Sequence, residues 1–342
     1  MKMNLKTVIA AMAAAAALVG CAEGVSTDIQ CGVEGDADGM MSVRMIYDDV
    51  MTKAETEDYV LALDEEKVVR KVSVLVFDKS TGMLNAFKQL TGMTQECKVS
   101  VPVGEKTVFA VVNGPDLGTV TRLEHFYALK DNMAVSDFDD DGLTLVGTAD
   151  CTVESGKTVE PTIAVKWLVA RVVLDKVTCK LPPQYGEMTV ECVYLGNANT
   201  IQDFAGNVSA MGNPDGYADA AKSRAIGRSG EKGFCPDYLY RNVGVTVPVG
   251  QNVTNSYYMY CHPNASATYT CIYVVATIAG ERNYYRVPLK STLKANYTYS
   301  VELTIANLGS LIPPTGDYQN GTIQAVVSMG GWTVGNSFVT EF

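Results

Sequence analysis

Near its end the chain carries a strand-like stretch, Thr322-Ile323-Gln324-Ala325-Val326-Val327-Ser328-Met329, followed by Gly330-Gly331-Trp332-Thr333-Val334. Apolar side chains recur at every second position, which places Ile323, Ala325, Val327 and Met329 on one face of a strand. The preceding residues, 311–321, contain two prolines and then turn-forming residues, so they predict a tether. Two interpretations stay open: a last strand that returns to its own sheet, or a strand meant for another subunit.

The composition favours a β protein. A chain of 342 residues is long enough for two domains. The formal charge of −11 argues against a nucleic-acid or anionic-membrane partner. Only 19% of the residues are charged, and the 18 tyrosines suit half-buried sheets. With only two histidines, His125 and His262, a histidine-based metal site or a catalytic triad has little material.

Alternation at strand period continues through the rest of the chain. It is clearest at Val72, Val74 and Val76, whose intervening residues are also mostly apolar, so both faces of that strand are expected to be buried. Gly104-Glu105-Lys106 predicts a hairpin turn, and residues 117–131 predict the one good helix. Other strands are predicted at 41–47, 83–90, 97–103, 107–113, 143–148, 152–153, 159–174, 243–247, 256–261, 268–278, 284–289 and 297–305. Such spacing is typical of an all-β sandwich.

The N-terminus predicts a secretion signal that ends at a lipid-modified cysteine. Lys2 and Lys6 precede an apolar, alanine-rich run that is too short to span a bilayer permanently. The run ends Leu18-Val19-Gly20-Cys21, which matches the bacterial lipobox and makes Cys21 the expected lipidation site. Several acyl chains on one residue anchor stably, because each buried methylene contributes ~0.8 kcal/mol. The alternative is an ordinary signal peptide that happens to contain a cysteine.

No catalytic or cofactor constellation is evident. Residues 137–142 begin like a calcium loop, but the twelfth position is Thr148 where a bidentate glutamate is required, which favours a solvated acidic loop. The nine cysteines include no Cys-x-x-Cys pair, so no zinc ribbon is expected. No nucleophile elbow, P-loop or dinucleotide fingerprint occurs. We therefore predict a non-enzyme without cofactors or metals, and a secreted hydrolase has nothing to support it.

Taken in order, these motifs resemble the FimA-type fimbrillins, pilus subunits of Gram-negative anaerobes. The lipobox at Cys21 is the first of them. Residues 72–78 with 103–113 resemble the start of the family's first domain, and residues 169–172 resemble the opening of its second. Residues 297–305, the tether and the strand around Trp332 resemble its C-terminal end. Each motif is moderately specific alone, whereas the ordered set spans nearly the whole chain.

The resemblance implies two transthyretin-like Greek-key β-sandwich domains and assembly with copies of itself and other fimbrial subunits by strand donation. A protease removes the lipidated N-terminal segment with its first strand, and a neighbour's C-terminal strand fills the groove. The implied donor residues are Ile323, Ala325, Val327, Met329, Trp332 and Val334. The implied first-strand residues that face the core are Met41, Val43, Met45 and Tyr47. The implied segments are signal 1–20, propeptide 21–53, domains 54–165 and 166–311, and tether with donor strand 312–342.

One departure concerns the cut, which in the family usually follows an arginine in the loop after the first strand. Residues 48–67 contain no arginine, so Lys53 and Arg44 are the candidates. An uncut subunit would instead keep its lipid in the outer membrane and act as the anchor of an extracellular fimbrium. A rival interpretation is a monomeric glycan-binding lipoprotein with an aromatic platform of Tyr257, Tyr258, Tyr284 and Tyr285.

Overall fold

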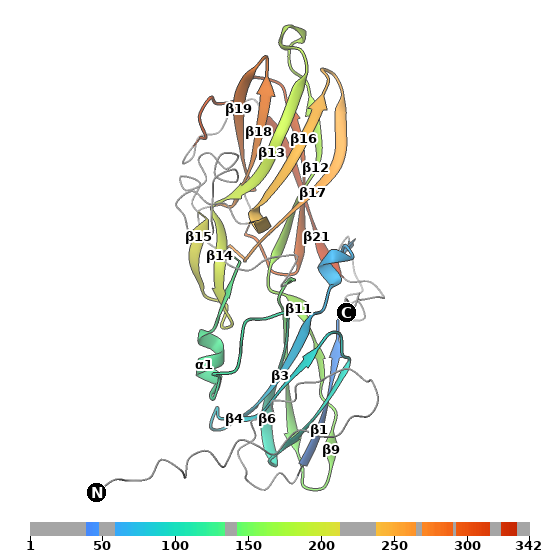
Figure 1. Ribbon diagram of the computed structural model, residues 1–342, viewed down its shortest axis with the longest axis vertical. Coiled ribbons are helices and arrows are strands. Elements are labelled where there is room, and N and C mark those ends of the chain that lie inside the picture. Colours follow the sequence, from blue (N-terminus) through green and yellow to red (C-terminus); the bar gives the residue numbers. More distant parts are fainter. Residues whose placement is uncertain are drawn as a thin grey trace, which may run out of the picture.

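The structure is a computed structural model that describes residues 39–47, 59–133, 142–212, 237–264, 269–289, 292–314 and 323–333. It contains two β-sandwiches that follow each other along the long axis of the molecule (Figure 1). Most of the described residues lie in strands, and a single short α-helix occurs among them. The predicted all-β class is therefore confirmed.

The first sandwich holds the N-terminal strands. One sheet contains β1 (Gly39–Ile46), β5 (Glu96–Val101), β9 (Thr158–Val159) and β10 (Thr162–Ala164). The other runs in the order β11 (Lys166–Trp167), β8 (Leu145–Val153), β6 (Gly104–Val112), β3 (Lys71–Asp78) and β4 (Leu84–Thr91). Val72, Val74 and Val76 of β3 face the core between the two sheets. Leu75 and Phe77 face the opposite side and pack on the helix, so β3 is buried on both faces.

The helix α1 (Leu123–Ala128) is much shorter than the predicted span 117–131. Leu117 and Val120 are buried as expected, but Arg122 just before the helix has an extended backbone. On the other side, residues 130–132 form β7 (Lys130–Asn132), which pairs with a strand of a small third sheet that adjoins the second sandwich. Tertiary pairing thus overrides the local helical pattern at both ends.

The predicted hairpin at Gly104-Glu105-Lys106 is wrong. These residues begin β6, and Gly104 lies opposite Val153 of β8. The preceding strand β5 pairs with β1 in the other sheet. Pro102 and Val103 carry the chain across the sandwich, so the connection joins two sheets instead of two neighbours in one sheet.

The second sandwich contains the remaining long strands. One sheet runs β17 (Asn252–Cys261), β12 (Ala170–Cys179), β20 (Tyr297–Ile305), β21 (Ile323–Thr333) and β2 (Tyr59–Leu61). The facing sheet runs β16 (Tyr240–Val247), β13 (Met188–Gly196), β18 (Cys271–Ile278) and β19 (Glu281–Pro288). A small third sheet joins β7 to β14 (Ala198–Asp203) and β15 (Val208–Gly212). Short 3-10 turns cover Glu65–Lys67, Pro183–Tyr185 and Asp237–Leu239.

Two ladders connect the sandwiches besides the covalent chain. The N-terminal strand β2 lies parallel to β21 in the second sandwich, with Tyr59 opposite Gly331. The strand β7 pairs with β14, with Asp131 opposite Gln202. One apolar cluster also continues from the first core to Tyr260 and Trp332. The junction between the sandwiches is therefore a packed region, and the strand β21 ends in it.

Candidate functional site: two strands and the junction between the sandwiches

The strand β1 fills the middle of its sheet. It pairs with β5 on one side and with β9 and β10 on the other. Met41 and Val43 have no exposed surface, while Met45 and Tyr47 are 3% and 6% exposed. Tyr47 also donates a hydrogen bond from its hydroxyl to the carbonyl oxygen of Thr94, at 2.9 Å. Removing β1 would leave an apolar slot flanked by two unpaired strand edges.

Arg44, the candidate cleavage residue in β1, lies on the outer face with an exposed side chain. Its backbone is nevertheless committed to the sheet, since its N–H donates to the carbonyl oxygen of Pro161 at 2.9 Å. It also lies opposite Glu96 and Thr162 in the two neighbouring strands. A protease can reach this peptide bond only after β1 has left the sheet. The other candidate, Lys53, and the predicted lipidation residue, Cys21, lie outside the described residues.

The strand β21 contrasts with β1. It pairs with β20 from Gly331 opposite Tyr297 to Ile323 opposite Ile305. Ala325, Val327 and Met329 lie opposite the buried Leu303, Val301 and Tyr299 of β20. Ala325 is nevertheless exposed, Met329 is 50% exposed, and Val327 is only partly buried against the core. The strand therefore returns to its own sheet in this conformation, with an apolar face that is barely covered.

The exception in β21 is Trp332, which is 2% exposed. Its indole stacks on that of Trp167, with ring centroids 4.1 Å apart and an angle of 8° between the planes. Tyr260 also stacks on it, at 5.9 Å. Trp332 therefore packs in its own subunit's core, as a last strand that returns to its own sheet would. Val334, the last predicted donor residue, lies outside the described residues.

A buried ion pair borders the Trp332 side chain. The Arg171 guanidinium lies 4.8 Å from the centroid of the Trp332 ring, and its Nη1 donates to Glu66 Oε2 at 2.7 Å. Both side chains have no exposed surface. The other oxygen of Glu66 accepts a hydrogen bond from the Tyr260 hydroxyl at 2.5 Å. Burial raises the pKa of Glu66 above its usual range, and the charge of Arg171 opposes that shift.

The sequence contains one signal for this ion pair that strand periodicity does not reveal. Arg171 is a single charge inside the apolar run Val169-Ala170-Arg171-Val172-Val173-Leu174. A charged residue in a buried strand requires a partner of opposite charge. The partner itself, Glu66, lies 105 residues away in an acidic segment and has no distinguishing signal.

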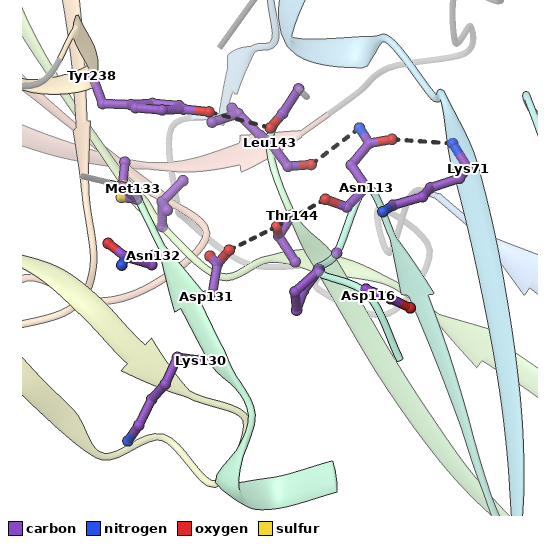
Figure 2. A pocket seen from close by; sticks show the side chains of 14 residues that line it. Lys71, Asn113, Asp116, Lys130, Asp131, Asn132, Met133, Leu143, Thr144 and Tyr238 are labelled. Carbon is purple, nitrogen blue, oxygen red and sulfur yellow. Dashed lines mark hydrogen bonds between the residues drawn. The ribbon is translucent and has the colours of Figure 1, made fainter. Parts of the chain in front are cut away.

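A cavity of about 280 Å³ lies near the same junction. Figure 2 shows that the side chains of Asn113 and Thr144 are hydrogen-bonded to neighbouring residues around it. Asn113 Nδ2 donates to the carbonyl oxygens of Val68 and Leu143, at 2.7 and 3.3 Å, and its Oδ1 accepts from the Arg70 N–H. Thr144 Oγ1 donates to Asp131 Oδ1 at 3.1 Å. These bonds hold the loops together, so the cavity is structural in character.

Asp131, one of the residues that line the cavity, has its Oδ2 3.4 Å from His262 Nε2. Burial lowers the pKa of His262, although the charge of Asp131 acts in the opposite direction. Burial also raises the pKa of Asp131, against the influence of His262 and Thr144. The arrangement therefore favours a histidine that stays neutral in the folded protein.

We expect this histidine to make the protein less stable in mild acid. As the pH falls below about 6.5, this histidine takes up a proton in the unfolded chain but stays neutral in the folded protein. The free energy of unfolding therefore decreases. His262→Gln should remove this part of the acid-side decline. Melting temperatures measured from neutral pH towards pH 5 test it, with His125→Gln as the control because His125 is exposed on α1. An identical decline in wild type and His262→Gln would contradict it. The raised pKa of Asp131 has the opposite effect on stability. Folded Asp131 takes up a proton at a higher pH than it does in the unfolded chain, which adds stability as the pH falls towards the ordinary carboxyl range.

The tyrosine platform expected for a glycan-binding protein is not assembled. Tyr257 and Tyr258 lie on β17, whereas Tyr284 and Tyr285 lie on β19 of the facing sheet. Tyr284 is 6% exposed and Tyr285 has no exposed surface. Tyr257 and Tyr258 are partly buried in the other sheet, so the four side chains do not form a shared surface and this platform is wrong.

The part of the chain that the structure describes contains neither a cluster of metal ligands nor a helix that could cross a membrane. No group of three or more metal-ligating side chains lies close enough together to hold an ion. No helix there is long and apolar enough to cross a bilayer. The calcium-loop residues Asp137, Asp139 and Asp141 lie outside the described residues.

Together these features define a protein of two β-sandwiches with a buried N-terminal strand and an exposed C-terminal one. No protein-family model and no curated protein matches the sequence. Among solved structures, a candidate cell adhesion protein of Parabacteroides distasonis superposes with a TM-score of 0.63 at 16% identity, covering 88% of this chain and 98% of that one. A fimbrilin from Porphyromonas gingivalis gives 0.57 at 14% identity, covering 88% and 99%. The tip fimbrial protein Mfa3 of the same species, truncated at its C-terminus, gives 0.50 at 15% identity, covering 86% and 99%.

These matches extend over most of the chain, which therefore has the fold of fimbrial subunits and cell adhesion proteins. The resemblance inferred from the ordered motifs is confirmed at the level of the fold.

Proposed function

We propose that this chain is a structural, non-catalytic subunit of a cell-surface fimbrium that polymerises by donating its C-terminal strand. The observation that carries the proposal is the contrast between two strands. The side chains of β1 at Met41, Val43 and Met45 fill a core, while β21 offers a similar apolar face at Ala325, Val327 and Met329 that its own subunit leaves largely exposed. A groove shaped by the first strand can accept the second.

The free energy of such a joint comes from two sources. Ladder hydrogen bonds on both sides of the donated strand contribute roughly 1 kcal/mol net each. Alternate apolar side chains that move from the exposed edge into the groove add about 25 cal/mol per Å² buried. Dissociation exposes the whole strand at once, so the joint is expected to persist kinetically.

The processing steps form part of the same proposal. Cys21 carries the lipid that holds the precursor in the outer membrane, and proteolysis after Lys53 separates β1 from the rest of the subunit. The committed backbone of Arg44 supports Lys53 as the site, because a cut at Arg44 needs β1 to leave its sheet first. While β1 is attached, its high effective concentration keeps the groove occupied.

N-terminal sequencing of the subunit recovered from surface filaments tests this route. A start at Ala54 is expected. A start at Met45 moves the cut to Arg44, and a retained, lipidated Cys21 makes the chain the anchor at the base of the fimbrium and contradicts the processing proposal. Absence of the chain from any filament, together with a monomeric protein on the cell surface, overturns the fimbrial proposal itself.

Charge placed on the apolar face of β21 should weaken assembly. Ile323→Asp with Val327→Asp puts two carboxylates into an apolar groove, and each unpaired charge carries a desolvation cost of several kcal/mol. The matched control is Val326→Asp, because Val326 lies on the opposite face of the strand and is 66% exposed. Polymerisation of processed subunits, followed by light scattering and negative-stain microscopy, should be blocked by the double variant and retained by the control. Equal filament yields from all three proteins would contradict the prediction.

A further inference from the structure

Among the described side chains of β21, only that of Trp332 is fully buried, so the strand is held mainly by one end. Its indole lies against Trp167 and Tyr260, and its backbone N–H donates to the carbonyl oxygen of Asn296 at 3.1 Å. Apart from Val327, the described side chains from Gln324 to Met329 are exposed. Loss of the Trp332 contacts would leave β21 with its ladders to β20 and β2 and the partly buried side chain of Val327.

Arg171 connects this end of β21 to the N-terminal part of the chain. Its Nη2 donates to the carbonyl oxygen of Leu61 in β2 at 3.2 Å, and its Nη1 donates to Glu66 at 2.7 Å. Its Nε donates to Thr298 Oγ1 of β20 at 2.9 Å. One guanidinium thus bonds to β2, to the turn after β2 and to β20, while it also contacts the ring of Trp332.

The strand β2 adds a second connection, because it forms a parallel ladder with β21 that covers only residues 331–333. This is the part of β21 that carries Trp332. The chain segment that joins β1 to β2, residues 47–58, is also the segment that contains Lys53. The strand that helps to hold Trp332 is therefore the first described element after the proposed cut.

The docked tryptophan also carries a cost. Trp332 Nε1 is buried and has no hydrogen-bond partner among the described residues. In water this donor is hydrated, so burial without a partner reduces the net gain from stacking. The docked state is consequently less stable than the stacking contacts of Trp332 alone would make it.

We propose that Trp332, Trp167, Arg171, Glu66 and β2 form a latch that keeps β21 in its own sheet, and that a cut between β1 and β2 loosens it. The inference rests on the proposed function, because release matters only for a strand that is donated. One cleavage then has two consequences: β1 can leave its groove, and β2 loses the chain that fixes its N-terminal end. Acceptor groove and donor strand become available together.

The two tryptophans of the chain provide a direct readout. Stacked indoles give an exciton-coupled circular dichroism signal, which should be present in the uncut full chain and absent in Trp167→Phe. Limited proteolysis between β1 and β2, verified by N-terminal sequencing, should weaken this signal. It should also make backbone amides of β21 exchange about tenfold faster or more, as expected for local opening.

Variants test the role of the ion pair in the uncut chain. Glu66→Gln removes the charge opposite Arg171 and should weaken the signal and speed amide exchange in β21. Tyr260→Phe removes only the hydroxyl that donates to Glu66 and should act in the same direction more weakly, which keeps the test valid if Glu66→Gln fails to fold. Val326→Ser lies on the same strand but touches no part of the latch, and should behave as wild type.

The outcomes separate the latch from strand donation. Unchanged exciton signal and unchanged exchange in β21 after the cut overturn the latch, even where filaments form. A released β21 in cut subunits that never polymerise supports the latch and overturns strand donation. Variants with loosened β21 that polymerise faster after processing support both.

Discussion

Deletion of residues 322–342 is expected to abolish filament formation while each subunit stays folded. The deletion removes β21, whose only fully buried described side chain is that of Trp332. Truncation of a buried tryptophan costs roughly 3–5 kcal/mol, and loss of the Arg171 contact with the ring adds to this. The truncated monomer should therefore melt cooperatively at a lower temperature than wild type. Size-exclusion chromatography and microscopy after processing measure the loss of assembly.

Trp332→Ala is the matched control for this deletion. It removes the same buried side chain but keeps the rest of the strand, so its melting temperature should fall by a similar amount. Because Trp332 is also one of the implied donor residues, filament yield should fall too, but less than after the deletion. Filaments from the truncated protein would show that β21 is not the donor. A truncated protein that is unfolded would show that β21 is a strand its own subunit needs in order to fold.

Val43→Asp should produce the second large effect, on the stability of the unprocessed subunit. Val43 has no exposed surface and packs in the first core, so the substitution buries an unpaired carboxylate. Substitutions of this kind reach roughly 3–5 kcal/mol. A destabilised β1 should also leave its groove more readily, so that uncut Val43→Asp subunits accept a donor strand where uncut wild type does not.

The neighbouring residue Met40 provides the control. It lies on the outer face of β1 and is 42% exposed, so Met40→Asp should change the free energy of unfolding by about 0.5 kcal/mol or less. Denaturant titration with size-exclusion chromatography of the uncut proteins compares the two variants. Equal midpoints and equally monomeric behaviour would contradict the burial of β1 as the reason for inhibition.

The all-β class was predictable from the sequence because the alternation of apolar side chains along a strand is visible in neighbouring residues. Val72, Val74 and Val76 show the buried face of β3 without any knowledge of their partners. The pairing of strands is not local. Gly104 could not be assigned to a sheet from its neighbours, since its partner Val153 is supplied by a later strand.

The same limit applies to the candidate site. The pattern of Met41, Val43 and Met45 indicates one apolar face of β1, which the structure places in the core. The burial of Trp332 had no counterpart in the local sequence, because the slot is built from β11, β12 and β17, all far upstream. Glu66 and Arg171 meet across the two sandwiches, and only a contact map or a structure reveals such a pair.

The two ladders that join the sandwiches have a mechanical consequence for an assembled fibre. In the free subunit, both β2 with β21 and β7 with β14 stiffen the waist of the molecule. Donation of β21 to a neighbour removes its ladder with β2. The ladder of β7 with β14 and the covalent chain near Trp167 then remain to resist bending at the waist. Subunits inside a fibre should therefore flex at this waist more than free subunits do. Such compliance would let a long fibre bend under flow by many small hinge motions, without strain on the joints between subunits.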